Sequence, residues 1–126
     1  MELVTPEKEN AWKFELFLQN FMPLVEEFKL GVLEVQRETE FAPIKNADSE
    51  AQIVVDSPTT SRTLMLQEHT NWLLKAGVKL GPDAFNKVEV SSLYSYEGEG
   101  IDLNKVGKEI TRPGYINEIG SFSLVT

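Results

Sequence analysis

The sequence predicts an α/β chain, described more closely as an α+β fragment in which helices come first and a small antiparallel sheet follows. Three observations support this class: an apolar stripe with helical spacing, a second helix with signals at both ends, and alternating residues over roughly the last forty positions. The 126 residues are 41% hydrophobic and 25% charged, which is typical of a globular protein with a packed core.

The first helix is predicted over about residues 9 to 22. Four large apolar side chains recur there at i, i+3, i+4 and i+7, and they are Phe14, Phe17, Leu18 and Phe21. Pro23 lacks a backbone donor and disfavours helical geometry at Met22, so we expect a stop or a kink at this point.

A buried strand and a rigid loop are predicted next. The run "KLGVLEVQ" favours a strand over about residues 30 to 36. In the loop "ETEFAPIKNADS", residues 38 to 49, Pro43 fixes its own φ, while Asn46 and Asp48 favour side-chain turns. Loops of this kind, at the end of a strand, often carry binding residues.

A second helix is predicted over roughly residues 58 to 76. Asp56 or Ser57 can cap it, Pro58 suits its first turn, and Gly77 suits the left-handed position after its end. Its predicted apolar face consists of Met65, His69, Trp72, Leu73 and Ala76.

The last segment is predicted to form a small antiparallel β unit. Val88 and Val90 alternate with polar residues, and "GSFSLV" alternates again near the end of the chain. Between them, the Pro113 and Gly114 pair suits a type II turn.

Charge and composition exclude several classes of protein. The net charge of −8, from 20 carboxylates against 12 lysines and arginines, gives no general attraction for nucleic acid or for an anionic membrane surface. The absence of cysteine excludes disulfides, thiolate metal sites and a cysteine nucleophile. No apolar stretch has the character of a signal peptide or a membrane span, so we expect a soluble, cytoplasmic protein.

Two single residues are candidates for chemistry. Lys45 is a cation in a stiff, polar loop, where it suits a phosphate ligand, although an ordinary solvated lysine is the more common role. His69 is the only histidine, and because it lies on or beside the apolar face of a predicted helix, a packed residue is favoured over a catalytic base.

The acidic pairs and the glycines give weaker signals. A solvated edge is favoured over a metal site for the two carboxylate pairs, which are Glu38 with Glu40 and Glu97 with Glu99. The "GEG" at residues 98 to 100 is too short for a phosphate-cradling loop.

Four segments, taken in order, resemble the C-terminal part of the eukaryotic UDP-N-acetylhexosamine pyrophosphorylases. They are "LEVQRETEFAPIKNADS", "DSPTTSR", "HTNWLLKAG" and "SSLYSYEGEG", and the upstream "TPEKENAWKFELFLQNF" is also similar to the segment that leads into a helix of that family. The resemblance covers most of residues 5 to 102 and weakens after residue 103.

This resemblance implies a nucleotidyl transfer. N-acetylglucosamine 1-phosphate attacks the α-phosphate of UTP and yields UDP-N-acetylglucosamine and pyrophosphate, with magnesium as the expected metal. Lys45 matches the lysine of the family that reaches the phosphates of the nucleotide sugar, which makes it the expected catalytic residue of this chain. Phe41, Pro43 and Asn46 belong to the same loop, where we expect them to shape the pocket and hold the lysine.

The sugar side of the expected site departs from the family pattern. Phe17 matches the first phenylalanine of a Phe-Xaa-Phe-Asp pattern that lines the N-acetyl pocket, but Gln19 and Asn20 occupy the positions of the second Phe and the Asp. A pyrophosphorylase for another sugar, glucose or galactose 1-phosphate, therefore stays open as an alternative.

The resemblance also implies a longer enzyme. Nothing in the chain matches the glycine-rich nucleotide loop of the family, so we expect a C-terminal portion that is inactive by itself, with the metal held elsewhere. Residues 1–49 are expected to end the mixed α/β sheet of the catalytic domain, and residues 50–126 to form a C-terminal helix and sheet domain. The alternative from a different class is a non-catalytic module for docking or self-association.

Overall fold

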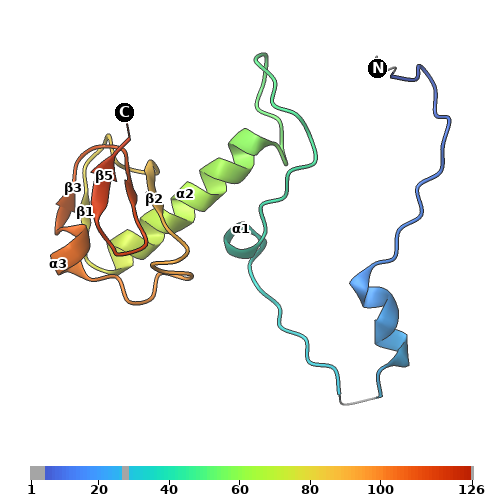
Figure 1. Cartoon of the computed structure of the whole chain (residues 1–126), viewed down its shortest axis with the longest axis horizontal. Coiled ribbons are helices and arrows are strands. Elements are labelled where there is room, and N and C mark those ends of the chain that lie inside the picture. The colour runs from blue at the N-terminus through green and yellow to red at the C-terminus, as the bar shows by residue number, and fades with distance from the viewer. Residues whose placement is uncertain (1–4, 27–28, 126) are drawn as a thin grey trace. The chain divides into compact units, whose positions relative to one another are not determined.

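The computed structural model describes residues 5–26 and 29–125, which fall into two compact units (Figure 1). One unit extends to residue 34 and the other begins at residue 35. The loop of residues 38–49 thus belongs to the second unit, while the domain boundary at residue 49 of a longer enzyme stays a prediction. None of the helices in the described part of the chain combines the length and the apolar character that crossing a membrane requires.

The first unit contains one short 3₁₀ helix, η1 (Leu18–Leu24), so the predicted α-helix over 9–22 is wrong. The helix ends one residue after Pro23, which confirms the predicted stop. Most of the stability of a helix comes from packing its apolar face. In this unit the stripe has no such surface among the described residues, because Phe14 is 92% exposed and Leu18 is 86% exposed.

The predicted strand over residues 30–36 is also wrong. The segment is extended but pairs with no other strand in the described chain, and Val32 and Leu33 are exposed. A strand needs neighbouring N–H and C=O groups as hydrogen-bond partners, and these are supplied by tertiary structure rather than by the segment itself.

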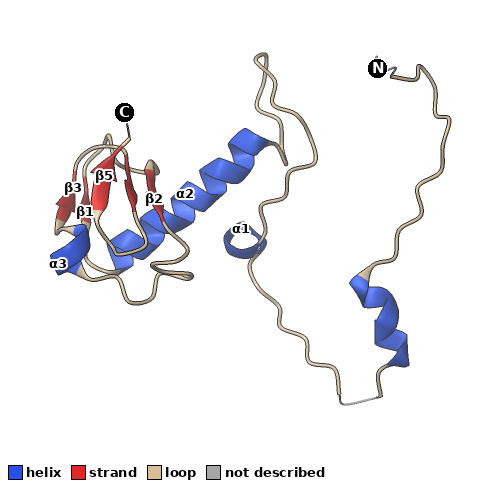
Figure 2. Cartoon of the chain, viewed as in Figure 1, coloured by secondary structure: helices blue, strands red, loops and turns tan. Residues whose placement is uncertain are grey.

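The second unit begins with a single turn, α1 (Arg37–Glu40), and is organised by the long helix α2 (Pro58–Lys75) (Figure 2). The predicted helix is confirmed, and Ser57 rather than Asp56 is its cap. The Ser57 side chain accepts from the N–H of Thr60, and the Thr60 side chain accepts from the N–H of Ser57. Gly77 follows the helix with a φ of 95°, as predicted.

The buried face of α2 is rotated slightly from the predicted one. His69 and Leu73 are buried as predicted, whereas Met65 is exposed and Thr70 is buried. The burial of Thr70 is tolerated because its hydroxyl accepts a hydrogen bond of 3.1 Å from the N–H of Asn86.

Short strands and one further helical turn complete the unit. These elements are β1 (Lys79–Leu80), β2 (Val88–Val90), α3 (Leu103–Val106), β3 (Glu109–Ile110), β4 (Gly114–Ile116) and β5 (Phe122–Leu124). β1 pairs with β3 in parallel, β2 pairs with β4 in parallel, and β4 pairs with β5 antiparallel.

The predicted antiparallel arrangement is therefore correct only for β4 and β5. Parallel pairs need a crossover connection, and the segments between the paired strands supply it. The predicted type II turn is wrong, because Gly114 starts β4 and pairs with Val88. A side chain at Gly114 would overlap the ring of Phe122, so close approach of the strands explains this glycine.

The core lies between α2 and these strands. Its buried members are mostly small β-branched residues, and they are Leu73, Val78, Ala84, Val88, Val90, Val106, Ile110 and Ile116. Figure 1 shows α2 running past the strands, with its N-terminal half extending toward the loop of residues 41–56. The core thus holds one end of α2, and the other end is available to position that loop.

Candidate functional site

The candidate lysine lies on a loop whose backbone is fastened to the start of α2. The backbone N–H groups of Lys45 and Asn46 both donate to the carbonyl of Asp56, at 2.7 and 3.0 Å. The side-chain amide of Asn46 donates to the carbonyl of Val55 at 2.9 Å. Asn46 therefore holds the loop through its side chain, and the backbone of Lys45 is fixed by the neighbouring turn.

Asp56 makes this attachment possible through an uncommon backbone conformation. Its φ of 56° lies in the left-handed region, which costs an L-residue about 1–2 kcal/mol. Its carbonyl accepts the two loop N–H groups, and its carboxylate lies 3.7 Å from the Arg37 guanidinium. These contacts offset the strain. They connect Arg37 and the loop of Lys45 and Asn46 to the start of α2.

Asp48 fastens the same loop at a second point. Its carboxylate accepts from the N–H of Thr59 at 3.1 Å, so it caps α2 in addition to Ser57. Hydrogen bonding to the Ser57 hydroxyl, together with the Thr59 N–H, holds the pKa of Asp48 below its ordinary value. The sequence indicated a turn at Asp48 but not this role, which depends on a contact between residues far apart in the chain.

The side chain of Lys45 is exposed and is not committed to the fold. Among residues 5–26 and 29–125, no carboxylate lies within 4.0 Å of its ammonium nitrogen. An ammonium without a protein counter-ion, on a backbone that is held in place, can contact an anionic ligand from solvent.

The other predicted binding residues lie in two places. Phe41 and Pro43 share the lysine loop, and Phe41 is half exposed with the Arg37 guanidinium 4.7 Å from its ring centre. Phe17 precedes η1 and Gln19 lies within it, both in the first unit and both exposed. The structure thus brings Phe41, Pro43, Lys45 and Asn46 onto one loop. Phe17 and Gln19 lie on a separate segment, in the first unit.

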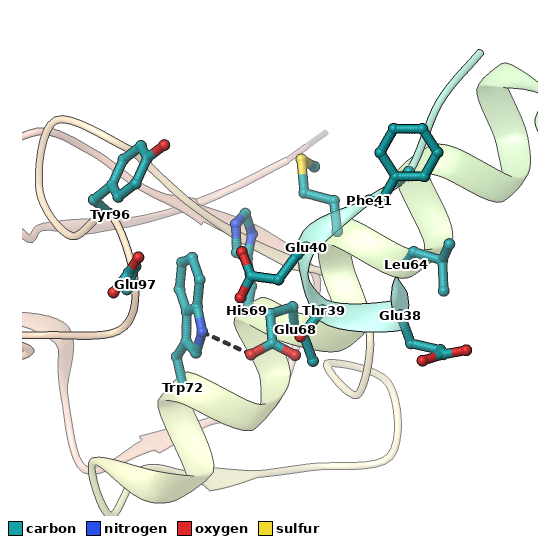
Figure 3. A pocket seen from close by; sticks show the side chains of 12 residues that line it. Glu38, Thr39, Glu40, Phe41, Leu64, Glu68, His69, Trp72, Tyr96 and Glu97 are labelled. Carbon is teal, nitrogen blue, oxygen red and sulfur yellow. Dashed lines mark hydrogen bonds between the residues drawn. The ribbon is translucent and has the colours of Figure 1, made fainter. Parts of the chain in front are cut away.

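An open cleft of about 480 Å³ lies beside the loop, bounded by α1, α2 and residues 96–97 (Figure 3). Lys45 does not line it. The cleft is bordered by four carboxylates, and they are Glu38, Glu40, Glu68 and Glu97. Because carboxylates repel phosphate, this cleft does not suit a nucleotide or a sugar phosphate.

His69 lies in the wall of this cleft and has a clear structural role. Its Nδ1 accepts from the backbone N–H of Val90 at 3.1 Å. Val90 belongs to the edge strand β2, which among the described residues pairs with β4 alone. Burial lowers the pKa of His69, opposed in part by the charges of Glu89 and Glu68. The prediction of a packed histidine is confirmed, and its specific function as a backbone acceptor could be found only from the fold.

Glu99 closes the loop of residues 91–100. Its carboxylate accepts from the N–H groups of Tyr96 and Glu97, at 2.9 and 2.6 Å, and from the Ser95 hydroxyl at 3.0 Å. The backbone N–H groups of Tyr96 and Glu97 lower the pKa of Glu99 to about 2. Glu97 and Glu99 are both exposed, as expected for a solvated edge, and Glu99 in addition binds its own loop.

Comparison with known proteins identifies relatives of one kind. No protein-family model matches the chain. It is 34% identical to the human UDP-N-acetylhexosamine pyrophosphorylase-like protein 1, over 92% of this chain and 25% of that protein. It is 38% identical to the UDP-N-acetylglucosamine pyrophosphorylase of Saccharomyces cerevisiae, over 90% of this chain and 22% of that protein. The chain is homologous to these pyrophosphorylases.

A plant relative agrees with this result. The UDP-N-acetylglucosamine diphosphorylase 2 of Arabidopsis thaliana is 38% identical over 80% of this chain and 20% of that protein. The chain thus spans a quarter or less of the length of these pyrophosphorylases, and it matches a C-terminal portion of them.

The segments that resemble the pyrophosphorylases converge on α2. The lysine loop is bound to the start of the helix, Ser57 caps it, and Trp72 near its end packs against Gly98 of the loop that Glu99 closes. Much of the resemblance therefore describes a scaffold around one helix, whereas the exposed ammonium of Lys45 makes no ion pair among the described residues.

Proposed function

We propose that the chain is the C-terminal portion of a UDP-N-acetylglucosamine pyrophosphorylase and supplies its phosphate-contacting lysine loop. The homology to pyrophosphorylases supports the reaction class. The observation that carries the role of the loop is the exposed ammonium of Lys45 on a backbone fixed by Asp56.

Lys45 acts by neutralising charge. In the proposed reaction, an oxygen of the sugar 1-phosphate attacks the α-phosphorus of UTP, the bond to the β-phosphate oxygen breaks, and pyrophosphate leaves. Two anions must approach each other, and a fixed cation beside the phosphates lowers the barrier to that approach. Asn46, Phe41 and Pro43 position the loop and shape its surroundings, while Phe17 and Gln19 face the sugar.

The remaining parts of the reaction lie outside this chain. Among the described residues, no group of three or more His, Cys, Asp or Glu side chains is arranged to hold a metal ion. As the resemblance implies, we assign magnesium to the substrate phosphates and to the rest of a longer, cytoplasmic enzyme. In that enzyme, residues 1–49 end the catalytic domain and residues 50–126 form the C-terminal domain, and the 126-residue chain alone is inactive.

Replacement of Lys45 in the full-length polypeptide tests this proposal. Lys45→Ala should lower kcat/KM for formation of UDP-N-acetylglucosamine by about 100-fold or more. Stability should not change, because the contacts of Lys45 to the fold are made by its backbone N–H, which alanine keeps. The matched control is Lys79→Ala, which removes an exposed lysine from β1. Unchanged turnover in Lys45→Ala would contradict the phosphate role and favour the docking or self-association module.

Gln19→Phe in the same polypeptide tests the identity of the sugar. If the residue at position 19 sets the preference, the variant should raise the ratio of kcat/KM for N-acetylglucosamine 1-phosphate over glucose and galactose 1-phosphates. A wild-type enzyme that already prefers glucose or galactose 1-phosphate would replace the proposed substrate by that alternative.

A further inference from the structure

The carboxylate-bordered cleft described above shares Phe41 with the lysine loop, but its carboxylates have no part in the proposed reaction. It lies wholly within the second unit, between α1, α2 and residues 96–97, and has a volume of about 480 Å³. Figure 3 shows aromatic rings on its two sides, with Phe41 beside α1 on one side and Trp72 with Tyr96 on the other. Its chemistry therefore combines apolar ring surface with negative charge.

The negative charge of the cleft is not neutralised by the chain itself. In the part of the chain that the structure describes, Glu40, Glu68 and Glu97 have no lysine or arginine within ion-pairing distance. Arg37, which precedes the cleft residue Glu38, lies over Phe41 and pairs with Asp56. A cationic occupant would complement these carboxylates, and an anionic one would be repelled.

The aromatic wall is held rigidly. The indole N–H of Trp72 donates to Glu68 at 2.9 Å, and the His69 ring lies 4.8 Å from the Trp72 ring. Gly98 closes against Trp72 so tightly that a Cβ at this position would lie 2.6 Å from the indole. Because the ring is already positioned, little conformational entropy is lost when a ligand stacks on it.

A buried donor also opens into the cleft. His69 is only 7% exposed, and its Nδ1 is occupied as the acceptor of Val90. The proton of the neutral ring then lies on Nε2, which finds no acceptor among the described residues. Every fully buried side-chain nitrogen or oxygen in the described chain has a partner, so Nε2 is not fully buried, and His69 lines the cleft. This N–H suits a carbonyl oxygen of an incoming backbone.

We propose that the cleft binds an extended, arginine-bearing segment of a separate protein. The guanidinium stacks on Trp72 and pairs with Glu40 and Glu97, while a backbone carbonyl of the same segment accepts from Nε2 of His69. Arginine is favoured over lysine because its planar group both stacks on rings and binds carboxylates in a fork geometry. The contact between Arg37 and Phe41 is an example of such stacking at the rim of the same cleft.

Trp72 provides the readout. The chain has two tryptophans, so Trp12→Phe leaves Trp72 as the single fluorophore. The probe is the peptide acetyl-Ala-Arg-Ala-amide, and the matched comparison peptide contains citrulline, which has the shape of arginine without its charge. We expect a saturable change in fluorescence with the arginine peptide, and a Kd at least 10-fold weaker for the citrulline peptide.

Variants of the cleft sharpen the test. Glu40→Gln and Glu97→Gln should each weaken binding of the arginine peptide by about 5-fold or more, whereas the exposed control Glu118→Gln should not change it. Neither cleft carboxylate accepts a hydrogen bond within the described chain, so both variants should keep the fold, as circular dichroism would verify. Equal binding of the two peptides, or equal weakening by Glu118→Gln, would overturn the proposal.

The source of the segment is tested in the full-length polypeptide. Binding of a fluorescently labelled arginine peptide should persist there with a similar Kd. If the cleft is instead closed to the peptide in the longer chain, another part of the same polypeptide covers it, and the separate protein is excluded. Neither result depends on Lys45, so the failure of this inference and that of the proposed reaction are distinguishable.

Discussion

Replacement of His69 tests how the fold satisfies the edge of its sheet. The imidazole accepts the N–H of Val90 at 3.1 Å, and Val90 is buried. His69→Leu keeps a similar volume but removes the acceptor, which leaves a buried donor unpaired at a cost of about 1–3 kcal/mol. With a urea m value of about 2 kcal/mol/M, a loss of ~2 kcal/mol lowers the unfolding midpoint by about 1 M.

The assay is urea unfolding of the 126-residue chain, followed by Trp72 fluorescence in the Trp12→Phe background. His69→Gln provides a matched comparison, because its amide oxygen can take over the acceptor role, and it should lose less stability than His69→Leu. The exposed Gln67→Leu on the same helix is the control and should leave the midpoint unchanged. An unchanged midpoint in His69→Leu would refute the acceptor role.

The pH dependence of the same variant supplies a second check. Burial lowers the pKa of His69 in the folded state, so the unfolded chain binds this proton more readily. Stability should therefore fall as the pH drops below about 6.5, the ordinary histidine pKa, toward the lower folded value. This part of the pH dependence should disappear in His69→Leu, and its persistence would assign it to other groups.

Three further predictions concern the scaffold around α2. Ser57→Ala removes the cap that accepts from the N–H of Thr60, so the free energy of unfolding should fall by about 1 kcal/mol, as measured by thermal unfolding. An unchanged free energy of unfolding would show that Asp48 is a sufficient cap. Gly98→Ala forces a methyl group against Trp72, so the free energy of unfolding should fall by about 1–3 kcal/mol and the fluorescence of Trp72 should change. An unchanged fluorescence spectrum would contradict this packing. Glu99 has a folded pKa of about 2, so stability should fall as the pH drops from about 4.5 to 2. Glu99→Gln should lower stability at neutral pH and reduce the dependence of stability on pH over that range.

Local signals were enough to predict α2. Ser57, Pro58 and Gly77 act on hydrogen bonds and backbone angles within a few residues of themselves, so their effect hardly depends on the rest of the chain. The loop that carries Lys45 was also found from sequence, through its turn-forming residues and its resemblance to the pyrophosphorylases. Whether Lys45 contacts phosphate stays a prediction.

Patterns that depend on a partner surface were misleading. The stripe of Phe14, Phe17, Leu18 and Phe21 has helical spacing, yet it forms a helix only where something covers it, and in the described residues these side chains are exposed. The extended run at 30–36 likewise pairs with no strand in the part of the chain that the structure describes. Alternation also could not distinguish parallel from antiparallel neighbours, because both leave the same two-residue period.

The sequence by itself determined the long helix, the signals at its two ends, the lysine loop and the relationship to a family of enzymes. Only the tertiary structure decided that Asp48 caps α2, that His69 accepts from an edge strand, and that Glu99 binds its own loop. The physical reason is the separation in sequence between the two partners of each hydrogen bond. Caps and turns are satisfied within a few residues, whereas a buried donor finds its acceptor wherever the fold brings one, and for Val90 that acceptor lies 21 residues away in the chain.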